Sequence, residues 1–96
     1  MPYVVSVIWT AKEGEEEAVA AALERLREPT RAEEGVLMWI PHRDPKDPRV
    51  FYVYEQYADE AAYTAHTETE HFQRDGFGDA IPRLADRRRE YYETVD

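Results

Sequence analysis

Two segments of the chain carry apolar side chains at both odd and even positions of a predicted strand, and this pattern restricts the fold more than any other feature. The segments are Tyr3–Thr10 and Val50–Tyr57, both rich in β-branched and aromatic residues. Successive side chains of a strand point to opposite faces, so the apolar residues fall into two sets. One set is Tyr3, Val5, Val7, Trp9, Phe51, Val53 and Tyr57, and the other is Val4, Ile8, Val50, Tyr52 and Tyr54. A sheet built from these strands needs cover on both of its faces.

The remaining sequence supplies two helices and two further strands. Apolar residues at helical spacing predict a helix over Glu15–Arg27, and Asp59 is the expected N-cap of a second helix that runs to about His66. Pro29 is expected to break or kink the first helix, which leaves residues 30–33 as a separate turn. The other expected elements are the strands Val36–Arg43 and Glu90–Val95 and a short helical turn over Ala80–Leu84.

The order of these elements is strand-helix-strand-strand-helix-strand, which is the order of the ferredoxin-like α+β fold. It predicts one four-stranded antiparallel sheet with the helices on one face, in a single domain over residues 1–96. Two helices cover only one face of such a sheet, and an uncovered apolar face usually marks an interface. We therefore expect a homodimer in which two sheets pack face to face.

Composition excludes several classes of function. The chain has no cysteine, which rules out disulfides, thiolate metal sites and cysteine nucleophiles. Its 12 basic and 21 acidic residues give a net charge of −9, which disfavours nucleic acid and anionic membranes as partners. The first apolar run is too short for a membrane span or a signal peptide, so a cytoplasmic location is expected. The basic run Arg87–Arg89 is interpreted as a solvated strand edge rather than an anion site.

The candidate catalytic residues lie in the segment Glu55–Phe72. His66 and His71 are two of the chain's three histidines, and the unperturbed pKa of histidine is the nearest to neutral pH of any side chain. His66 would act as a general base at a cavity or would fix its helix to the sheet, whereas for His71 the structural role is favoured. Glu55 shares the inward register of its strand and needs a buried partner, for which His66 and Arg43 are candidates. It would either orient the imidazole or form an ion pair that secures the second helix.

Aromatic residues are numerous for a small domain. Most of them are expected in the core or in the dimer interface, although a cavity lined by such rings would stack a planar ligand. The candidates for contact with an aromatic substrate are Trp9, Trp39, Phe51, Phe72 and Phe77.

Four segments together resemble the antibiotic biosynthesis monooxygenase family. They are Thr30–Gly35 (T-R-A-E-E-G), His42–Pro48 (H-R-D-P-K-D-P), Phe51–Tyr57 (F-Y-V-Y-E-Q-Y) and Ala62–Phe72 (A-Y-T-A-H-T-E-T-E-H-F), in the order and at the spacing of that family. The resemblance implies a dimeric α+β barrel with a cavity beside His66. It does not select one reaction, because the family includes cofactor-free oxygenases of polycyclic phenols, quinol oxygenases, haem-degrading enzymes and isomerases of small phosphorylated sugars.

No cofactor and no metal are expected. The haem-degrading members carry an asparagine on the first strand, a tryptophan on the second helix and an axial histidine beyond it. This chain has no asparagine, and His66 and Gly76 occupy the other two positions. His66 and His71 are five residues apart, a turn of about 500° on a helix, and no carboxylate or third histidine stands at an obvious ligand spacing from them.

The resemblance therefore favours a cofactor-independent monooxygenase that uses O₂ on a phenolic, quinol or polyketide-like aromatic molecule. Such a substrate supplies its own electrons once a base removes a proton, so the protein needs a base and a cavity that excludes water. Two alternatives stay open: an isomerase or cyclase in which histidine moves a proton beside a carbonyl, and a dimeric protein that binds a small ligand without catalysis. Arginines in the cavity wall would favour the isomerase. A cavity filled by the protein's own Trp and Tyr side chains would favour the binding protein.

Overall fold

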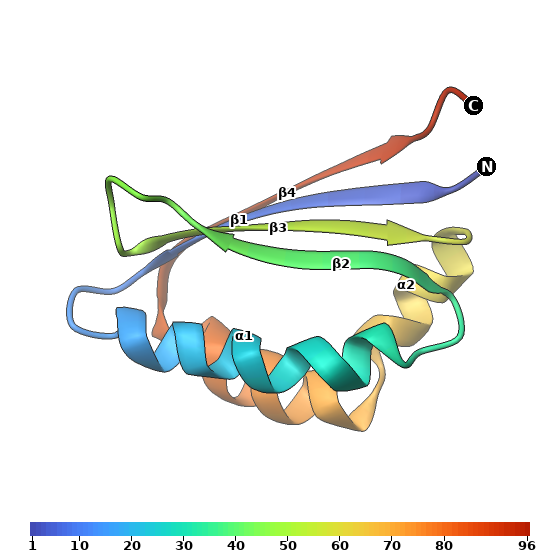
Figure 1. Cartoon of the computed structure of the whole chain (residues 1–96). Coiled ribbons are helices and arrows are strands. Elements are labelled where there is room, and N and C mark those ends of the chain that lie inside the picture. Colours follow the sequence, from blue (N-terminus) through green and yellow to red (C-terminus); the bar gives the residue numbers. More distant parts are fainter.

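The computed structural model describes all residues, 1–96, and consists of one sheet with its helices on one side (Figure 1). The strands are β1 (Tyr3–Ala11), β2 (Val36–Arg43), β3 (Val50–Tyr57) and β4 (Leu84–Glu93), and the helices are α1 (Glu16–Arg31), α2 (Glu60–Thr67), the π-helix η1 (Phe72–Ala80) and the short 3₁₀-helix η2 (Ile81–Arg83). The strand order in the sheet is β2-β3-β1-β4, and every neighbouring pair is antiparallel. This is the ferredoxin-like α+β fold that the order of the elements predicts.

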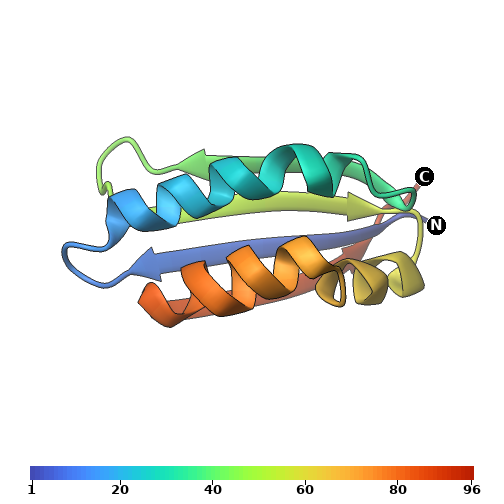
Figure 2. The same cartoon turned by 90° about the horizontal axis from the view of Figure 1, so that it is seen from below.

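The core lies between the helices and one face of the sheet. Seen from below, α1 runs along β2 and β3, whereas α2 and η1 follow one another beneath β1 and β4 (Figure 2). The buried cluster consists of Val5, Val7, Trp9, Ala11, Val19, Ala22, Leu23, Leu26, Trp39, Phe51, Val53, Tyr57 and Ala80. Apart from Ala11, its members on β1 and β3 belong to the inward-facing set that the strand alternation predicts. The remaining residue of that set, Tyr3, is partly buried against the cluster.

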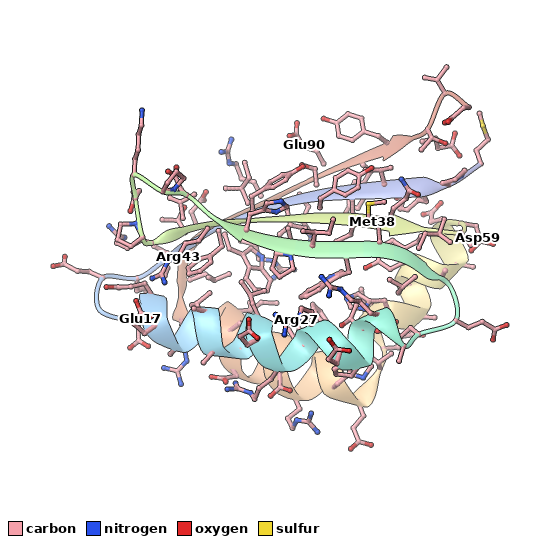
Figure 3. The ribbon with its side chains drawn as sticks, viewed as in Figure 1. Glu17, Arg27, Met38, Arg43, Asp59 and Glu90 are labelled. Atoms are coloured by element: carbon pink, nitrogen blue, oxygen red, sulfur yellow. The ribbon has the colours of Figure 1, made fainter.

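The other face of the sheet has no helix over it. Met38 and Glu90 lie on this side (Figure 3). Met38 and Ile40 of β2 are exposed, and Tyr52 and Tyr54 of β3 are half-buried. The strands are therefore apolar on both faces, as predicted, and only one face is covered within the chain. No helix is both long enough and apolar enough to cross a membrane.

Helix α1 is longer than predicted, because Pro29 lies inside it and does not end it. Proline lacks the N–H donor and disturbs the carbonyl four residues earlier. Leu26 and Thr30 are both buried, and this packing continues the helix to Arg31.

Strand β4 begins at Leu84 rather than at Glu90 and ends at Glu93 rather than at Val95. Its first half is rich in charged residues and shows no apolar alternation, so the sequence pattern gives no sign of a strand there. β4 pairs only with β1 and forms an edge of the sheet. An edge strand tolerates a polar sequence because it buries less of its surface.

Two glycines allow close approaches that shape the helical layer. A Cβ atom on Gly35, just before β2, would lie 2.4 Å from the Cβ of Ala62 on α2. A Cβ atom on Gly76 would lie 2.8 Å from the ring of Phe72. Glycine at these positions lets α2 approach the start of β2 and lets the Phe72 ring lie against η1. The π-helix itself was not among the predicted elements.

Candidate functional site

A cavity of about 30 Å³ lies between the inner face of the sheet and the helices α2 and η1. Its volume suffices for one or two water molecules. The residues that line it are Val7, Trp9, Trp39, Val53, Glu55, Tyr63, His66, Thr67, Phe72, Phe77, Ile81, Arg87 and Arg89. Those that the sequence singles out as candidates are Trp9, Trp39, Glu55, His66, Phe72 and Phe77.

Two of the candidate residues, Phe51 and His71, do not line this cavity. The ring of Phe51 is buried, and the Cζ atom of Arg43 lies 5.0 Å from its centre. Phe51 instead borders a separate surface hollow together with Ala20 and Leu23 of α1. Its inward direction is as predicted, but it lies beside α1 rather than at the cavity beside α2 and η1.

Pairing between the strands determines which polar groups face the cavity. Glu55 is the cross-strand neighbour of Val5 on β1 and of Trp39 on β2. Trp9 is the cross-strand neighbour of Arg87 on β4. Cross-strand neighbours point to the same side of a sheet, so these side chains share the inner face. The strand alternation correctly predicts this direction for Glu55.

Glu55 is a buried carboxyl group with a single hydrogen-bond partner. The residue is 6% exposed, and its Oε1 accepts a hydrogen bond from the Tyr57 hydroxyl. Burial raises the pKa of the Glu55 carboxyl to about 7, while this hydrogen bond and nearby positive charge act in the opposite direction. The partners expected from the sequence were His66 and Arg43, but Arg43 donates to Glu17 at 2.8 Å instead (Figure 3). A carboxyl group that titrates near neutral pH can accept a proton and return it.

Helix α2 positions His66 in the cavity wall. The helix is capped by Asp59, whose side chain accepts a hydrogen bond from the Ala62 N–H at 2.9 Å. His66 is 1% exposed, and its ring centre lies 4.6 Å from that of Phe72. Its Nδ1 lies 2.9 Å from Oε2 of Glu33, and this is the only hydrogen bond of the ring within the chain. With the proton on Nδ1 donated to Glu33, the lone pair of Nε2 is free.

Sequence reasoning does not single out Glu33, yet Glu33 holds both candidate histidines. It lies between α1 and β2, and its Oε2 is also 2.7 Å from Nε2 of His71. Burial acts to raise the pKa of Glu33, but the hydrogen bonds from His66 and His71 outweigh burial and leave this pKa below its ordinary value. A carboxylate with two imidazole donors stays ionised and fixes both rings. The only sequence signal is its place just before Gly35, in a segment that resembles the family.

Glu33, His66 and His71 are also the one group of side chains that could hold a metal ion, with ligand atoms within 4.8 Å of one another. The sequence shows no carboxylate at an obvious ligand spacing from the two histidines, and the fold supplies Glu33 from 33 and 38 residues away. Three protein ligands suffice for a zinc site with an open position. Each imidazole is already hydrogen-bonded to the carboxylate, however, so the group is satisfied without an ion.

Two arginines of β4 contribute to the cavity wall. Arg87 and Arg89 line it and form no ion pair. Arg88 points to the other face of the sheet, because its cross-strand neighbour is Ile8 of β1. Its Nε lies 3.9 Å from a carboxylate oxygen of Asp86. Burial, together with the charge of Arg89, lowers the pKa of Arg87. Arg89 donates a long hydrogen bond of 3.4 Å to the Tyr63 hydroxyl. The interpretation of this run as a solvated strand edge therefore holds for Arg88 and fails for Arg87.

Known proteins of similar sequence and shape point to one family. Residues 2–74 match the family model described as antibiotic biosynthesis monooxygenase. PA3566 from Pseudomonas aeruginosa is 33% identical, with a TM-score of 0.90, over 99% of this chain and 95% of that chain. SO0527 from Shewanella oneidensis is 28% identical, with a TM-score of 0.87, over 95% of this chain and 88% of that chain. A crystal structure of an antibiotic biosynthesis monooxygenase is 28% identical, with a TM-score of 0.89, over 100% of both chains. No curated protein sequence matches the chain.

Proposed function

Because the chain belongs to the antibiotic biosynthesis monooxygenase family, we propose that it is a cofactor-independent monooxygenase of a small phenolic, quinol or polyketide-like aromatic molecule. One observation carries this proposal: Nδ1 of His66 is hydrogen-bonded to Glu33 at 2.9 Å, while Nε2 has no partner, in the wall of a largely apolar cavity. An imidazole held by a carboxylate in this way is suited to act as a general base at neutral pH.

The reaction begins when Nε2 of His66 takes the proton of the substrate hydroxyl. The resulting anion gives one electron to O₂, and the substrate radical and superoxide combine through a new carbon–oxygen bond. The peroxide takes up a proton. Its O–O bond then breaks, so that one oxygen atom leaves as water and the other stays as a carbonyl, while the ring carbon gives up its hydrogen as a proton. The substrate supplies all the electrons, and the protein supplies the base and a cavity that excludes water.

Glu55 is proposed to act as an acid later in this sequence. Its pKa of about 7 means that a large share of the carboxyl groups carry a proton at neutral pH. A protonated Glu55 can supply the proton that the peroxide takes up. In this scheme Glu33 orients the base, which is one of the two roles that the sequence leaves open for Glu55.

The size of the cavity limits what enters it. At about 30 Å³ it has room for a guest of the size of water or O₂, so an aromatic substrate requires part of the wall to move. Phe77 is the best placed wall residue for such a movement. It is exposed, stands between Gly76 and Gly78, and touches Phe72 edge to face at 5.1 Å between ring centres.

Oxygen uptake tests the proposal. The protein is mixed with 1,4-naphthohydroquinone or another model hydroquinone in an oxygen electrode, beside the variants His66→Ala and His42→Ala. His42 is a matched control because it is exposed on β2 and its Nδ1 lies 3.1 Å from the Tyr52 carbonyl oxygen. We expect uptake above the buffer rate for the wild type and His42→Ala only. Uptake at the buffer rate with every hydroquinone would reject the oxygenase and leave the isomerase or a binding protein.

An isomerase is the second candidate, and the arginines in the cavity wall favour it. Arg87 and Arg89 could bind a phosphate or carboxylate group of a substrate. His66 would then move a proton at the carbon beside a carbonyl group. Anaerobic incubation with dihydroxyacetone phosphate in D₂O distinguishes the two reactions. Deuterium at the carbon beside the carbonyl, dependent on His66, supports the isomerase, because an oxygenase does not turn over without O₂.

We further propose that the protein is a homodimer through the uncovered face of the sheet. Ile40 is exposed in the middle of the apolar surface of β2. Obligate interfaces usually bury more than about 2,000 Å² in total, and a charge in their centre disrupts them. Light scattering is expected to give a dimer for the wild type and for Glu70→Lys on the helical side, and a monomer for Ile40→Lys. A stable wild-type monomer at micromolar concentration would reject the dimer.

A further inference from the structure

Tyr57 is a fully buried tyrosine beside the proposed acid. The side chain is 0% exposed. Tyr57 and Glu55 are two residues apart on β3, so they share its inner face. The Tyr57 hydroxyl donates a hydrogen bond to Oε1 of Glu55. This is the only hydrogen bond that the Glu55 carboxyl group forms within the chain, so its second oxygen, Oε2, has no partner.

Two rings of α2 hold the Tyr57 ring in place. The ring centre of Tyr63 lies 5.3 Å from that of Tyr57 in an edge contact, and the ring centre of His66 lies 5.6 Å from it. Burial and the neighbouring Glu55 raise the pKa of the Tyr57 hydroxyl. The hydroxyl therefore keeps its proton at neutral pH and remains a donor from a fixed ring.

The two carboxyl oxygens of Glu55 differ in what they can reach. Glu55 lines the cavity, whereas Tyr57 does not. Oε1 is therefore bonded on the buried side, and Oε2 is the oxygen left for a guest in the cavity. In a protonated carboxyl group one oxygen is a carbonyl acceptor and the other carries the O–H. A donor at Oε1 favours Oε1 as the carbonyl oxygen and Oε2 as the hydroxyl.

We propose that Tyr57 is a positioning residue for the acid: its hydroxyl occupies Oε1 of Glu55 and thereby places the transferable proton on Oε2, toward the cavity. The inference rests on the proposed function, in which Glu55 supplies the proton that the peroxide takes up. That step breaks the O–H bond at Oε2, forms an O–H bond on the peroxide and leaves Glu55 as a carboxylate. Tyr57 keeps its own proton and stabilises this carboxylate through the same hydrogen bond. Uptake of a proton from water then restores the acid.

Other charged groups also face Glu55. Burial has the largest effect on its pKa and favours the neutral acid, and the Tyr57 hydrogen bond comes next and favours the carboxylate. His66 on α2 and Arg89 on β4 act in the same direction as Tyr57, whereas Glu33 acts with burial. Loss of the Tyr57 hydroxyl alone should therefore raise the pKa of Glu55 above about 7.

Carbon-13 magnetic resonance of the intact protein, labelled at the glutamate carboxyl carbons, tests this. The signal that Glu55→Gln removes is that of Glu55. Tyr57→Phe is expected to raise the pKa of Glu55 by about one to two units, the size of a hydrogen bond to a charged group. Tyr3→Phe is the control and should leave this pKa unchanged, because Tyr3 is the cross-strand neighbour of Tyr57 but does not donate to Glu55. An unchanged pKa in Tyr57→Phe, or an equal rise in Tyr3→Phe, would overturn the inference.

The wild type decides the outcome if Tyr57→Phe does not fold. In protein labelled at the tyrosine Cζ carbons, one signal should move with the same midpoint as the Glu55 carboxyl carbon and stay still in Glu55→Gln. The absence of such a signal would overturn the inference as well.

The pH profile of oxygen uptake separates a positioning role from core packing. With 1,4-naphthohydroquinone, uptake above the buffer rate should fall as pH rises through the pKa of Glu55. In Tyr57→Phe this fall should move to higher pH by as much as the pKa of Glu55 does, and in Tyr3→Phe it should not move. A raised Glu55 pKa in Tyr57→Phe, with no uptake by the wild type from any hydroquinone, would keep the placement of the proton and remove the oxygenase. Uptake whose fall stays at the same pH in Tyr57→Phe would remove the inference alone.

Discussion

Glu33 and Glu55 are two carboxyl groups near the same histidine, His66, and their surroundings shift their pKa values in opposite directions. Glu33 accepts hydrogen bonds from two imidazoles, His66 and His71, and its pKa lies below the ordinary value despite partial burial. Glu55 accepts only from the neutral hydroxyl of Tyr57, and burial raises its pKa to about 7. The identity of the partner, as well as the depth of burial, decides whether a carboxyl group keeps its charge. One group is thereby suited to hold an imidazole and the other to exchange a proton.

The largest expected effect is the loss of turnover when His66, the proposed base, is removed. His66→Ala is expected to lower the rate with the true substrate by about 10²–10⁴, the usual cost of a general base. Its free energy of unfolding should fall by only about 0.5–3 kcal/mol, the common range for point mutants. Steady-state kinetics and urea unfolding of the same preparation measure the two quantities. Normal turnover by His66→Ala would move the base to His71, to Glu55 or to the substrate itself.

The next effect is the pH dependence that Glu55 contributes to stability. Its pKa is raised in the folded state from the ordinary value of 4.5 to about 7. A raised carboxyl pKa means that the folded protein prefers the neutral form, so this stability is present below pH 4.5 and is lost as pH rises through about 7. We expect the wild type to lose about 3 kcal/mol relative to Glu55→Gln across this window, from the 1.36 kcal/mol that corresponds to each pKa unit. Urea unfolding of both proteins at several pH values measures the difference. A difference that stays constant with pH would show that Glu55 titrates normally.

Glu33 should make the free energy of unfolding depend on pH in the opposite direction, with a smaller amplitude. Its pKa is lowered in the folded state, so its stabilising effect is present above the ordinary carboxyl pKa and is lost as pH falls through the lowered value. Glu33→Gln is expected to cost about 1.5–3 kcal/mol at neutral pH, the range for hydrogen bonds to a charged group. The cost should shrink on acidification, when the wild-type carboxylate itself takes up a proton. If Glu33→Gln and Glu55→Gln respond to pH with the same sign, the contrast between the two carboxyl groups is wrong.

The contrast also shows which parts of the molecule the sequence predicts. The inward direction of Glu55 follows from the period of two along β3, and the start of α2 follows from the capping side chain of Asp59. Both signals are local in the chain. The same is true of the order of the elements, which gives the fold, and of the apolar character of both faces of the sheet.

Other features depend on contacts between distant segments, and local patterns do not report these. Glu33 meets His66 and His71 where α2 approaches the start of β2, and Gly35 leaves room for this approach. The inward direction of Arg87 depends on its register with Trp9 on β1. From the sequence alone, a run of charged residues indicates a solvated strand edge. Only the register with the partner strand shows which of these side chains point inward. The continuation of α1 through Pro29 likewise depends on burial of the helix rather than on the preferences of single residues.

The smallest expected effect concerns metal ions at Glu33, His66 and His71, where the hydrogen bonds already satisfy the imidazoles. We expect no stoichiometric iron or zinc and no haem absorption band in the purified protein, and a melting temperature that neither EDTA nor excess Zn²⁺ changes. The measurement is sensitive, because a ligand at 100 times its dissociation constant stabilises the folded state by about 2.7 kcal/mol. In a domain of this size that corresponds to a rise of roughly 10–20 °C. A rise of several degrees with Zn²⁺ that is absent in Glu33→Gln and in His71→Ala, but present in His42→Ala, would show that the group is a metal site. Glu33 would then act as a ligand rather than as the carboxylate that orients the base.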